Sequence, residues 1–125
     1  MKIYLAGQFE SQKRIRKEAH KVWALGHDVV SSWLNEVIKP ANMPHREFMK
    51  KLAMKDIAEV NAADLLIQDT IKMSIRGGAA TEFGLALHSF QNKQVWVVGP
   101  LRSVFHYLCD RHFNNWKECL AALKQ

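Results

Sequence analysis

Asp56 is an acidic residue on the side of a predicted helix that should be apolar. With a period of about 100° per residue, six apolar residues of segment 48–60 share one half of the helical wheel: Phe48, Met49, Leu52, Ala53, Ile57 and Val60. Asp56 lies near the middle of that half. A carboxylate directed at a core is costly unless it is paired, hydrogen-bonded or faces a cleft. Asp56 is therefore either a structural aspartate bound to an arginine or to backbone N–H groups, or an acid–base group whose pKa is adjusted by burial.

Glu82 is the second such residue, in the sequence GGAATEFG of residues 77–84. This segment predicts the first turns of a helix, where Gly77 and Gly78 let the backbone approach a ligand closely and the helix N-terminus favours negative charge. We expect Glu82 at the edge of the buried face of that helix. An ionised glutamate there can act as a nucleophile or bind a sugar hydroxyl. The alternative is an acidic residue that only complements the helix dipole.

Together the two carboxylates suit cleavage of a glycosidic bond. Two carboxyl groups about 5 Å apart support a double displacement at an anomeric carbon. One attacks to form a glycosyl-enzyme, and the other protonates the leaving group and then activates the acceptor. Asp56 and Glu82 are predicted on the helices that flank the strand Asp64–Gln68, a geometry that lets both reach one cleft but does not require it.

Apolar runs alternate with helical patterns along the chain, and these elements must position the carboxylates. Predicted strands cover Lys2–Ala6, His27–Trp33, Asp64–Gln68 and Lys93–Val98, with Arg111–Phe113 as a candidate edge strand. Predicted helices cover about 11–25, 45–61 and 77–91. Asn115 is expected to cap a last helix, with Glu118 completing a capping box.

Continuously apolar strands separated by helices predict a parallel sheet covered on both faces. We therefore expect a single α/β domain over residues 1–125, with three layers and a doubly wound, Rossmann-like or flavodoxin-like sheet of four to five strands. Such folds bind ligands beyond the carboxyl ends of the strands, where the strand order reverses. That edge is expected to gather the loop Gly7-Gln8-Phe9, the loop before Gly77 and the segment Gly99–Ser103.

Composition limits the classes of function. Of the 125 residues, 48% are hydrophobic and 24% are charged, as in ordinary globular domains. No apolar run approaches the roughly 20 residues that cross a bilayer, and the first residues do not form a secretory signal. Cys109 and Cys119 have no partner at metal-ligand spacing. We expect a cytoplasmic protein with reduced thiols, without a metal site and without a membrane partner.

The chain carries a formal net charge of +6, much of it in two blocks of residues, 13–21 and 50–55. These blocks are either solvated helix faces or a source of attraction for an anionic partner. The sequence shows no nucleic-acid motif and no interleaving of aromatic and basic residues. A small nucleoside or nucleotide is therefore favoured over a polynucleotide.

Four segments carry a resemblance to a known family: IYLAG at 3–7, DIAEVNAAD at 56–64, GGAATEFGLAL at 77–87 and VWVVGP at 95–100. In this order and spacing, over about residues 2–100, the chain resembles a distant member of the nucleoside 2-deoxyribosyltransferase family, together with its relatives that hydrolyse 2′-deoxynucleoside 5′-monophosphates. The resemblance implies that Glu82 attacks C1′ of the deoxyribose, that Asp56 binds the sugar and assists proton transfer, and that Tyr4 orients Glu82. It also implies a homodimer or larger assembly.

The substrate end departs from the family pattern. Gln8 and Glu10 stand where the monophosphate hydrolases carry serine and arginine. Arg76 stands where transferases tend to carry a carboxylate and hydrolases a serine, and a guanidinium there suits a phosphate unless it pairs with an acidic neighbour. The residues expected to bind substrate are Gly7, Gln8, Phe9, Arg76, Gly77, Gly78 and Ser103. The family also borrows a C-terminal residue from a neighbouring subunit, for which the candidates are Arg102, Ser103, Asn114 and Asn115.

The sequence thus predicts an enzyme that cleaves or transfers at the N-glycosidic bond of a 2′-deoxynucleoside or its 5′-monophosphate through a covalent glycosyl-glutamate. Carboxylates and a nucleobase leaving group suffice for this reaction, so no cofactor is expected. One alternative is a phosphoribohydrolase of the lysine-decarboxylase-like kind, whose glycine-rich turn and glutamate look similar. The other is a non-catalytic module that binds nucleotides or nucleic acid.

Overall fold

A sheet of five parallel strands forms the centre of the computed structural model, which describes residues 1–36, 42–72, 77–89 and 93–124. The strands are β1 (Lys2–Ala6), β2 (Asp28–Val29), β3 (Leu65–Asp69), β4 (Gln94–Val98) and β5 (Arg111–Phe113), in the spatial order β2-β1-β3-β4-β5. This order is the flavodoxin-like one, which reverses between β1 and β3.

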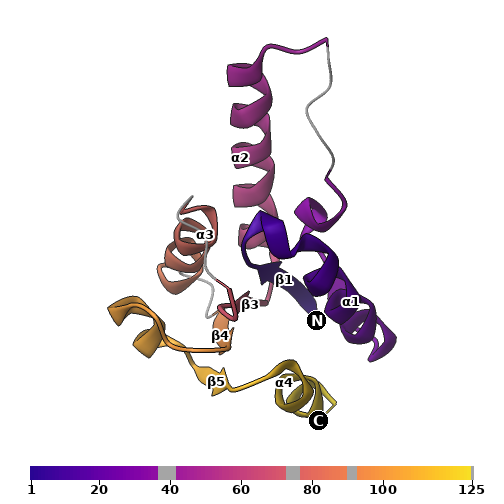
Figure 1. The fold of residues 1–125 in the computed structure, drawn as a ribbon, viewed down its shortest axis with the longest axis vertical. Helices are drawn as coiled ribbons and strands as arrows, with labels where there is room; N and C mark the ends of the chain where they lie inside the picture. Colours follow the sequence, from indigo (N-terminus) through magenta and orange to yellow (C-terminus); the bar gives the residue numbers. More distant parts are fainter. Residues whose placement is uncertain (37–41, 73–76, 90–92, 125) are drawn as a thin grey trace.

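Four α-helices and short 3-10 helices join the strands in the described part of the chain. The α-helices are α1 (Gln12–Ala24), α2 (His45–Ala62), α3 (Gly78–Leu87) and α4 (Trp116–Leu123), and the 3-10 helices are η1 (Phe9–Ser11), η2 (Ser32–Asn35) and η3 (Val104–Leu108). Figure 1 shows α2 and α3 on one side of the sheet and α1 and α4 on the other. The single-domain, three-layer α/β fold expected from the sequence is confirmed. None of the described helices is long and apolar enough to span a membrane.

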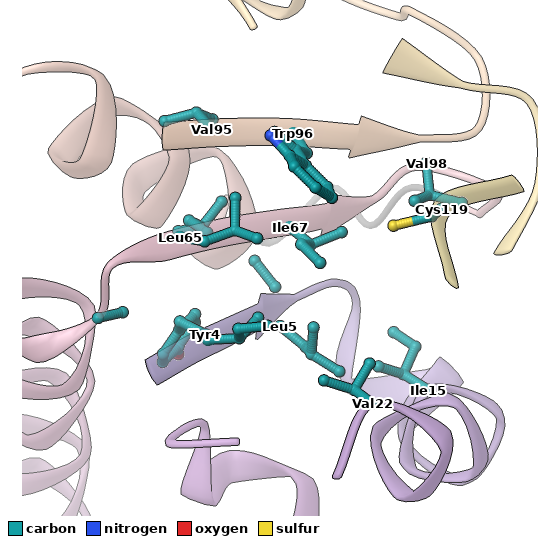
Figure 2. Close-up of a cluster of buried hydrophobic side chains, with 14 of the residues drawn as sticks. Tyr4, Leu5, Ile15, Val22, Leu65, Ile67, Val95, Trp96, Val98 and Cys119 are labelled. Atoms are coloured by element: carbon teal, nitrogen blue, oxygen red, sulfur yellow. The ribbon is translucent and has the colours of Figure 1, made fainter. Parts of the chain in front are cut away.

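The core lies on both faces of β1, β3 and β4. Leu5, Ile67 and Val98 are buried, and Ile15 of α1 and Cys119 of α4 belong to the same buried cluster (Figure 2). The strands are continuously apolar because helices cover both faces, as expected for a parallel sheet. Both cysteines are free thiols, as the sequence predicted.

The segment expected as a strand over His27–Trp33 forms a strand only at Asp28 and Val29, so that prediction is wrong beyond β2. Side chains explain where the pairing stops. The Leu5 N–H donates to Ser31 Oγ at 3.1 Å, and Trp33 Nε1 donates to the Leu5 carbonyl at 2.7 Å. The N–H and C=O of Leu5 are therefore both hydrogen-bonded to side chains, so a longer β2 would find no backbone partner at Leu5. The chain continues as η2 instead.

Two helix ends also differ from the expected ones. α3 ends at Leu87 rather than near residue 91, and residues 90–92 lie outside the described ranges. At α4, Asn115 caps the helix by accepting the Glu118 N–H at 2.9 Å. The Glu118 carboxylate returns to the N–H of Asn114 at 3.1 Å and not to that of Asn115, so the capping box is displaced by one residue.

A buried carboxylate at the end of β3 joins the layer of α1 and α4 to the sheet. Asp69 is 1% exposed, and its two oxygens accept both terminal nitrogens of Arg14 at 2.7 and 2.9 Å. Trp116 Nε1 and the Ile71 N–H donate to the same carboxylate at 2.7 and 3.0 Å. Charge-assisted and bidentate bonds of this kind are among the stronger polar contacts in proteins, so Asp69 fixes the sheet edge where the site is built.

Candidate active site

A cavity of about 450 Å³ opens beside the carboxyl end of β1, between α2 and α3. Its lining residues come from the β1 loop and η1, from η2 and the residue after it, from α2, and from the start of α3: Gly7, Gln8, Phe9, Trp33, Glu36, Phe48, Met49, Leu52, Ala53, Asp56, Gly77, Gly78, Ala79, Ala80 and Glu82. Most of this wall is apolar, and its acidic groups are Glu36, Asp56 and Glu82. The cavity thus lies at the edge of the sheet where the sequence predicted a ligand.

Glu82 lies in the second turn of α3 and is held by a tyrosine from the neighbouring strand. The Tyr4 hydroxyl donates a hydrogen bond to Glu82 Oε2. Burial raises the pKa of Glu82 to about 7, the bond from Tyr4 lowers it, and the negative field of Asp56 raises it further. Burial and the Glu82 charge raise the pKa of Tyr4 far above its usual value. The tyrosine therefore keeps its proton and remains a donor to Glu82.

Asp56 lies on α2 and faces the same cavity. Its Oδ1 is buried and accepts no hydrogen bond within the described chain, and Lys55 Nζ lies 3.8 Å from it. Burial raises the pKa of Asp56 to about 6, Lys55 opposes this, and the charges of Glu36 and Glu59 add to it. The arginine or backbone partner that a purely structural aspartate needs is absent from the described residues around Asp56. Its geometry instead suits a group that exchanges a proton.

Three further charged residues surround the pair, and none of them was expected at the site from the sequence. Lys55 Nζ lies 2.6 Å from Glu36 Oε1, and Glu59 Oε1 accepts the Ser32 N–H at 3.1 Å. Glu59 follows Asp56 by three residues, so helical spacing could have indicated that the two carboxylates lie close together. Glu36 follows η2, a helix without a clear sequence signal.

The apolar half of α2 is not the core face that the helical wheel predicted. Val60 is the one buried residue of α2, while Met49 and Ile57 are 49% and 43% exposed. Figure 1 shows the reason: the N-terminal turns of α2 extend beyond the sheet, so no layer covers them. Phe48, Met49 and Leu52 line the cavity instead.

The backbone at the other end of the cavity comes from two glycine-containing turns. A Cβ at Gly7 would lie 2.4 Å from Ile15 Cδ1, so the β1 loop passes close to α1. Gly77 has φ +80°, a left-handed conformation that favours glycine, and it begins α3 without a capping side chain. Gln8 lines the cavity while its Nε2 donates to Ser11 Oγ at 3.1 Å, and Phe9 lines it as well.

Of the remaining residues expected at the substrate end, Ser103 lies outside this cavity. Arg76 lies outside the described residues. Ser103 precedes η3, is not part of the cavity lining, and donates its N–H to His106 Nδ1 at 3.3 Å. Arg102 donates to the carbonyls of Thr70 and Ile71 at 2.7 and 2.9 Å. Within the described ranges, no group of three or more His, Cys, Asp or Glu side chains is arranged to hold a metal ion.

Comparison with known proteins finds likeness in structure alone. No protein-family model matches the chain, and no curated protein matches it. A 2-deoxyribosyltransferase from the bacterium Bacillus psychrosaccharolyticus superposes with a TM-score of 0.79 at 22% identity, over 98% of this chain and 96% of that one. Clostridium botulinum CMP N-glycosidase BcmB superposes with a TM-score of 0.65 at 17% identity, over 98% of both chains.

A conserved protein from Enterococcus faecalis V583 gives a TM-score of 0.72 at 20% identity, over 100% of this chain and 98% of that one. At such identities the likeness establishes the fold, and the fold alone does not define an activity. The whole chain therefore adopts the Rossmann-like fold of these proteins.

Glu82→Gln is expected to raise the free energy of unfolding at pH 8 and to leave it nearly unchanged at pH 4.5. Between the unfolded pKa of 4.5 and the folded value of about 7, the folded state holds a proton that the unfolded chain releases, so stability falls as pH rises through this range. A neutral amide avoids that loss, which is on the order of 1–2 kcal/mol after allowance for solvent screening. Urea unfolding at pH 4.5, 6 and 8 measures it.

The matched control is Glu47→Gln, an exposed glutamate in the first turn of α2. Its effect is expected to stay within about 0.5 kcal/mol at every pH. A Glu82→Gln variant less stable than the parent protein at pH 8 would contradict the raised pKa of Glu82.

Proposed function

We propose that this chain is a distant member of the nucleoside 2-deoxyribosyltransferase family, and that it cleaves or transfers at the N-glycosidic bond of a 2′-deoxynucleoside or its 5′-monophosphate. The observation that carries the proposal is the tyrosine-held glutamate in the cavity, with Tyr4 donating to Glu82 and Asp56 on the same wall. The fold shared with a 2-deoxyribosyltransferase and a CMP N-glycosidase supports it.

In the first step the ionised Glu82 attacks C1′ of the sugar. A C1′–O bond to the carboxylate forms as the C1′–N bond breaks, and the base leaves with the bonding electron pair. The hydrogen bond from Tyr4 leaves one carboxylate oxygen directed at the cavity and favours the ionised form. The positive charge that develops on the sugar in an oxocarbenium-like transition state adds a further attraction for the carboxylate.

Asp56 supplies and recovers the proton. With a pKa raised to about 6, it can hold or release a proton near neutral pH, as general acid–base catalysis requires. The reaction starts from the form in which Asp56 is protonated and Glu82 is ionised, which is the less populated form because the pKa of Glu82 is raised to about 7. It protonates the departing base, directly or through a water, and binds a sugar hydroxyl. In the second step it deprotonates water, or the N–H of a second base, which attacks C1′ and releases Glu82. The products are the free sugar in hydrolysis and a new nucleoside in transfer.

The cavity offers distinct surfaces to the two ends of such a substrate. A volume of about 450 Å³ lies within the range of small-molecule sites. Phe48, Met49 and Leu52 form an apolar wall suited to the face of a nucleobase. The first turn of α3, which also lines the cavity, presents N–H groups with a partial positive charge, which suits the sugar–phosphate end.

Every step of this reaction uses carboxylates, a tyrosine hydroxyl and water, so the proposal needs neither a metal nor an organic cofactor. For Arg76 and Ser103 we propose the roles expected from the sequence. Arg76 binds a 5′-phosphate, and Ser103 contributes to the site of a neighbouring subunit. A cytoplasmic location, expected from the free cysteines, also stays a prediction.

Base release from a panel of deoxy- and ribonucleosides and their 5′-monophosphates, followed by chromatography, tests the proposal. Glu82→Ala is expected to lower the rate by roughly a thousandfold or more, because the covalent step is lost. Asp56→Asn is expected to lower it by roughly a hundredfold or more. Glu47→Gln serves as the unaffected control. Exchange onto an added base distinguishes a transferase from a hydrolase.

Two outcomes would replace the proposed reaction. Release only from ribonucleoside 5′-monophosphates would indicate a phosphoribohydrolase of the lysine-decarboxylase-like kind. Nucleotide binding without base release, unchanged in the Glu82 variant, would indicate a binding module.

We also propose that the chain associates with itself through the exposed apolar side of α2. Met49 and Ile57 are 49% and 43% exposed there, and Met49 also lines the cavity. Exposed apolar patches commonly mark interfaces. A second copy on this face would cover the cavity mouth and exclude water. Light scattering after size exclusion is expected to show a dimer or larger species, and Ile57→Glu a monomer.

The control for this prediction is Phe105→Glu in η3, which introduces the same charge at an equally apolar site that is 62% exposed. A monomeric parent protein at micromolar concentration would contradict self-association. Equal dissociation by both variants would contradict the assignment of the interface to α2.

A further inference from the structure

A second cavity, of about 490 Å³, lies between α1, β2 and η2, on the other side of η2 from the first cavity. It shares no lining residue with the first cavity, and the reaction proposed above makes no use of it. Its polar and aromatic lining includes Arg16, His20 and Trp23 of α1 and Ser32 and Asn35 of η2.

The charge of this cavity suits an anion. Arg16, His20 and Trp23 follow one another at helical spacing and form one stripe along α1. Arg16 Nε donates to the Leu34 carbonyl at 2.8 Å, which fixes the direction of the guanidinium. Its two terminal nitrogens have no partner within the described chain. Because none of the lining residues is acidic, these donors face a cavity without a competing carboxylate.

The aromatic side chain of the cavity is unusually open. Trp23 is 69% exposed, whereas Trp33, Trp96 and Trp116 are at most 6% exposed. An exposed indole next to a cation offers a surface on which a planar ring can stack. Trp23 lies seven residues after Arg16, about 10 Å along the helix. The indole ring and the guanidinium can therefore contact different parts of one ligand.

The floor of the cavity adds hydrogen-bonding groups. β2 is the outermost strand, and Asp28 and Val30 donate their N–H groups to the carbonyls of Met1 and Ile3, each at 2.9 Å. Strand alternation therefore turns the N–H and C=O of Val29 to the open side. The Ser32 Oγ is buried without a hydrogen-bond partner, which is uncommon in proteins. A rotation of this hydroxyl into the cavity breaks no bond.

We propose that this cavity is a second binding site, for a nucleoside monophosphate. Arg16 holds the phosphate through its terminal nitrogens, Trp23 stacks on the base, and the outward backbone of Val29 pairs with the polar edge of the base. The Ser32 hydroxyl turns to the ligand. No bond is made or broken in the ligand, so the site serves recognition.

The test is the binding of AMP to a protein that also carries Glu82→Gln, so that turnover at the first cavity does not enter. Stacking is expected to quench the emission of Trp23 saturably, and equilibrium dialysis is expected to show AMP bound in addition to any that occupies the first cavity. Arg16→Gln is expected to weaken binding roughly tenfold or more, because a charge-assisted pair is lost. The matched control, Lys17→Gln, removes the same charge from the next position of α1, which is exposed and outside the cavity. Its effect is expected to stay below about twofold.

Ser32→Ala separates ligand binding from folding. Its hydroxyl has no partner in the free protein, so the variant is expected to unfold at the same urea concentration as the parent and to bind AMP less tightly. Three results would overturn the proposal: no saturable quenching at millimolar AMP, equal losses in Arg16→Gln and Lys17→Gln, or inorganic phosphate binding as tightly as AMP. The function proposed for the first cavity is tested separately, because base release is measured in protein that keeps Glu82.

Discussion

The hydrogen bond from Tyr4 to Glu82 is the interaction on which the candidate site depends. It joins β1 to α3 across the sheet–helix boundary, and it offsets part of the cost of burying a carboxylate among apolar residues. The hydrogen bond does not offset the whole cost of burial, because the pKa of Glu82 remains near 7. Asp56 adds a second carboxyl group with a raised pKa. An apolar cavity thus holds two acids whose protonation changes near neutral pH, and the double displacement proceeds from the form in which Glu82 is ionised and Asp56 is protonated.

Contacts elsewhere in the fold hold the strands around Tyr4 in position. Asp69 ties the end of β3 to α1 and α4 through Arg14 and Trp116, and Leu5 holds the turn after β2 through Ser31 and Trp33. Asp69 lies on β3, beside the strand of Tyr4, and Leu5 follows Tyr4 on β1, so these contacts fix both strands against α1, α4 and η2. The cavity itself lies where strand order reverses between β1 and β3, the usual ligand position in doubly wound sheets.

The sequence predicted the sheet and its helices, because apolar periodicity carries that information. Periodicity only allowed Asp56 and Glu82 to reach one cleft, and the place of Tyr4 beside Glu82 was implied by the resemblance of short segments to a known family. The sequence did not reveal where β2 ends. At Leu5, side chains take the place of a backbone partner strand, and such contacts leave no periodic pattern in the sequence. The exposure of α2 was missed for a related reason: a helical wheel shows which side is apolar, but not whether another layer covers it. The Asp69 network and Glu36 depend on residues far apart in the chain, which no local pattern connects.

The most direct measurement is the intact mass of the protein after incubation with a nucleoside whose sugar carries fluorine at C2′. Fluorine destabilises the oxocarbenium-like transition state, and a good leaving base lets the first step proceed while the second is slow. The account predicts a mass increase of one fluorinated sugar, located by peptide mapping on Glu82 and absent in Glu82→Gln. Base release without any adduct, or an adduct on another residue, would contradict Glu82 as the nucleophile.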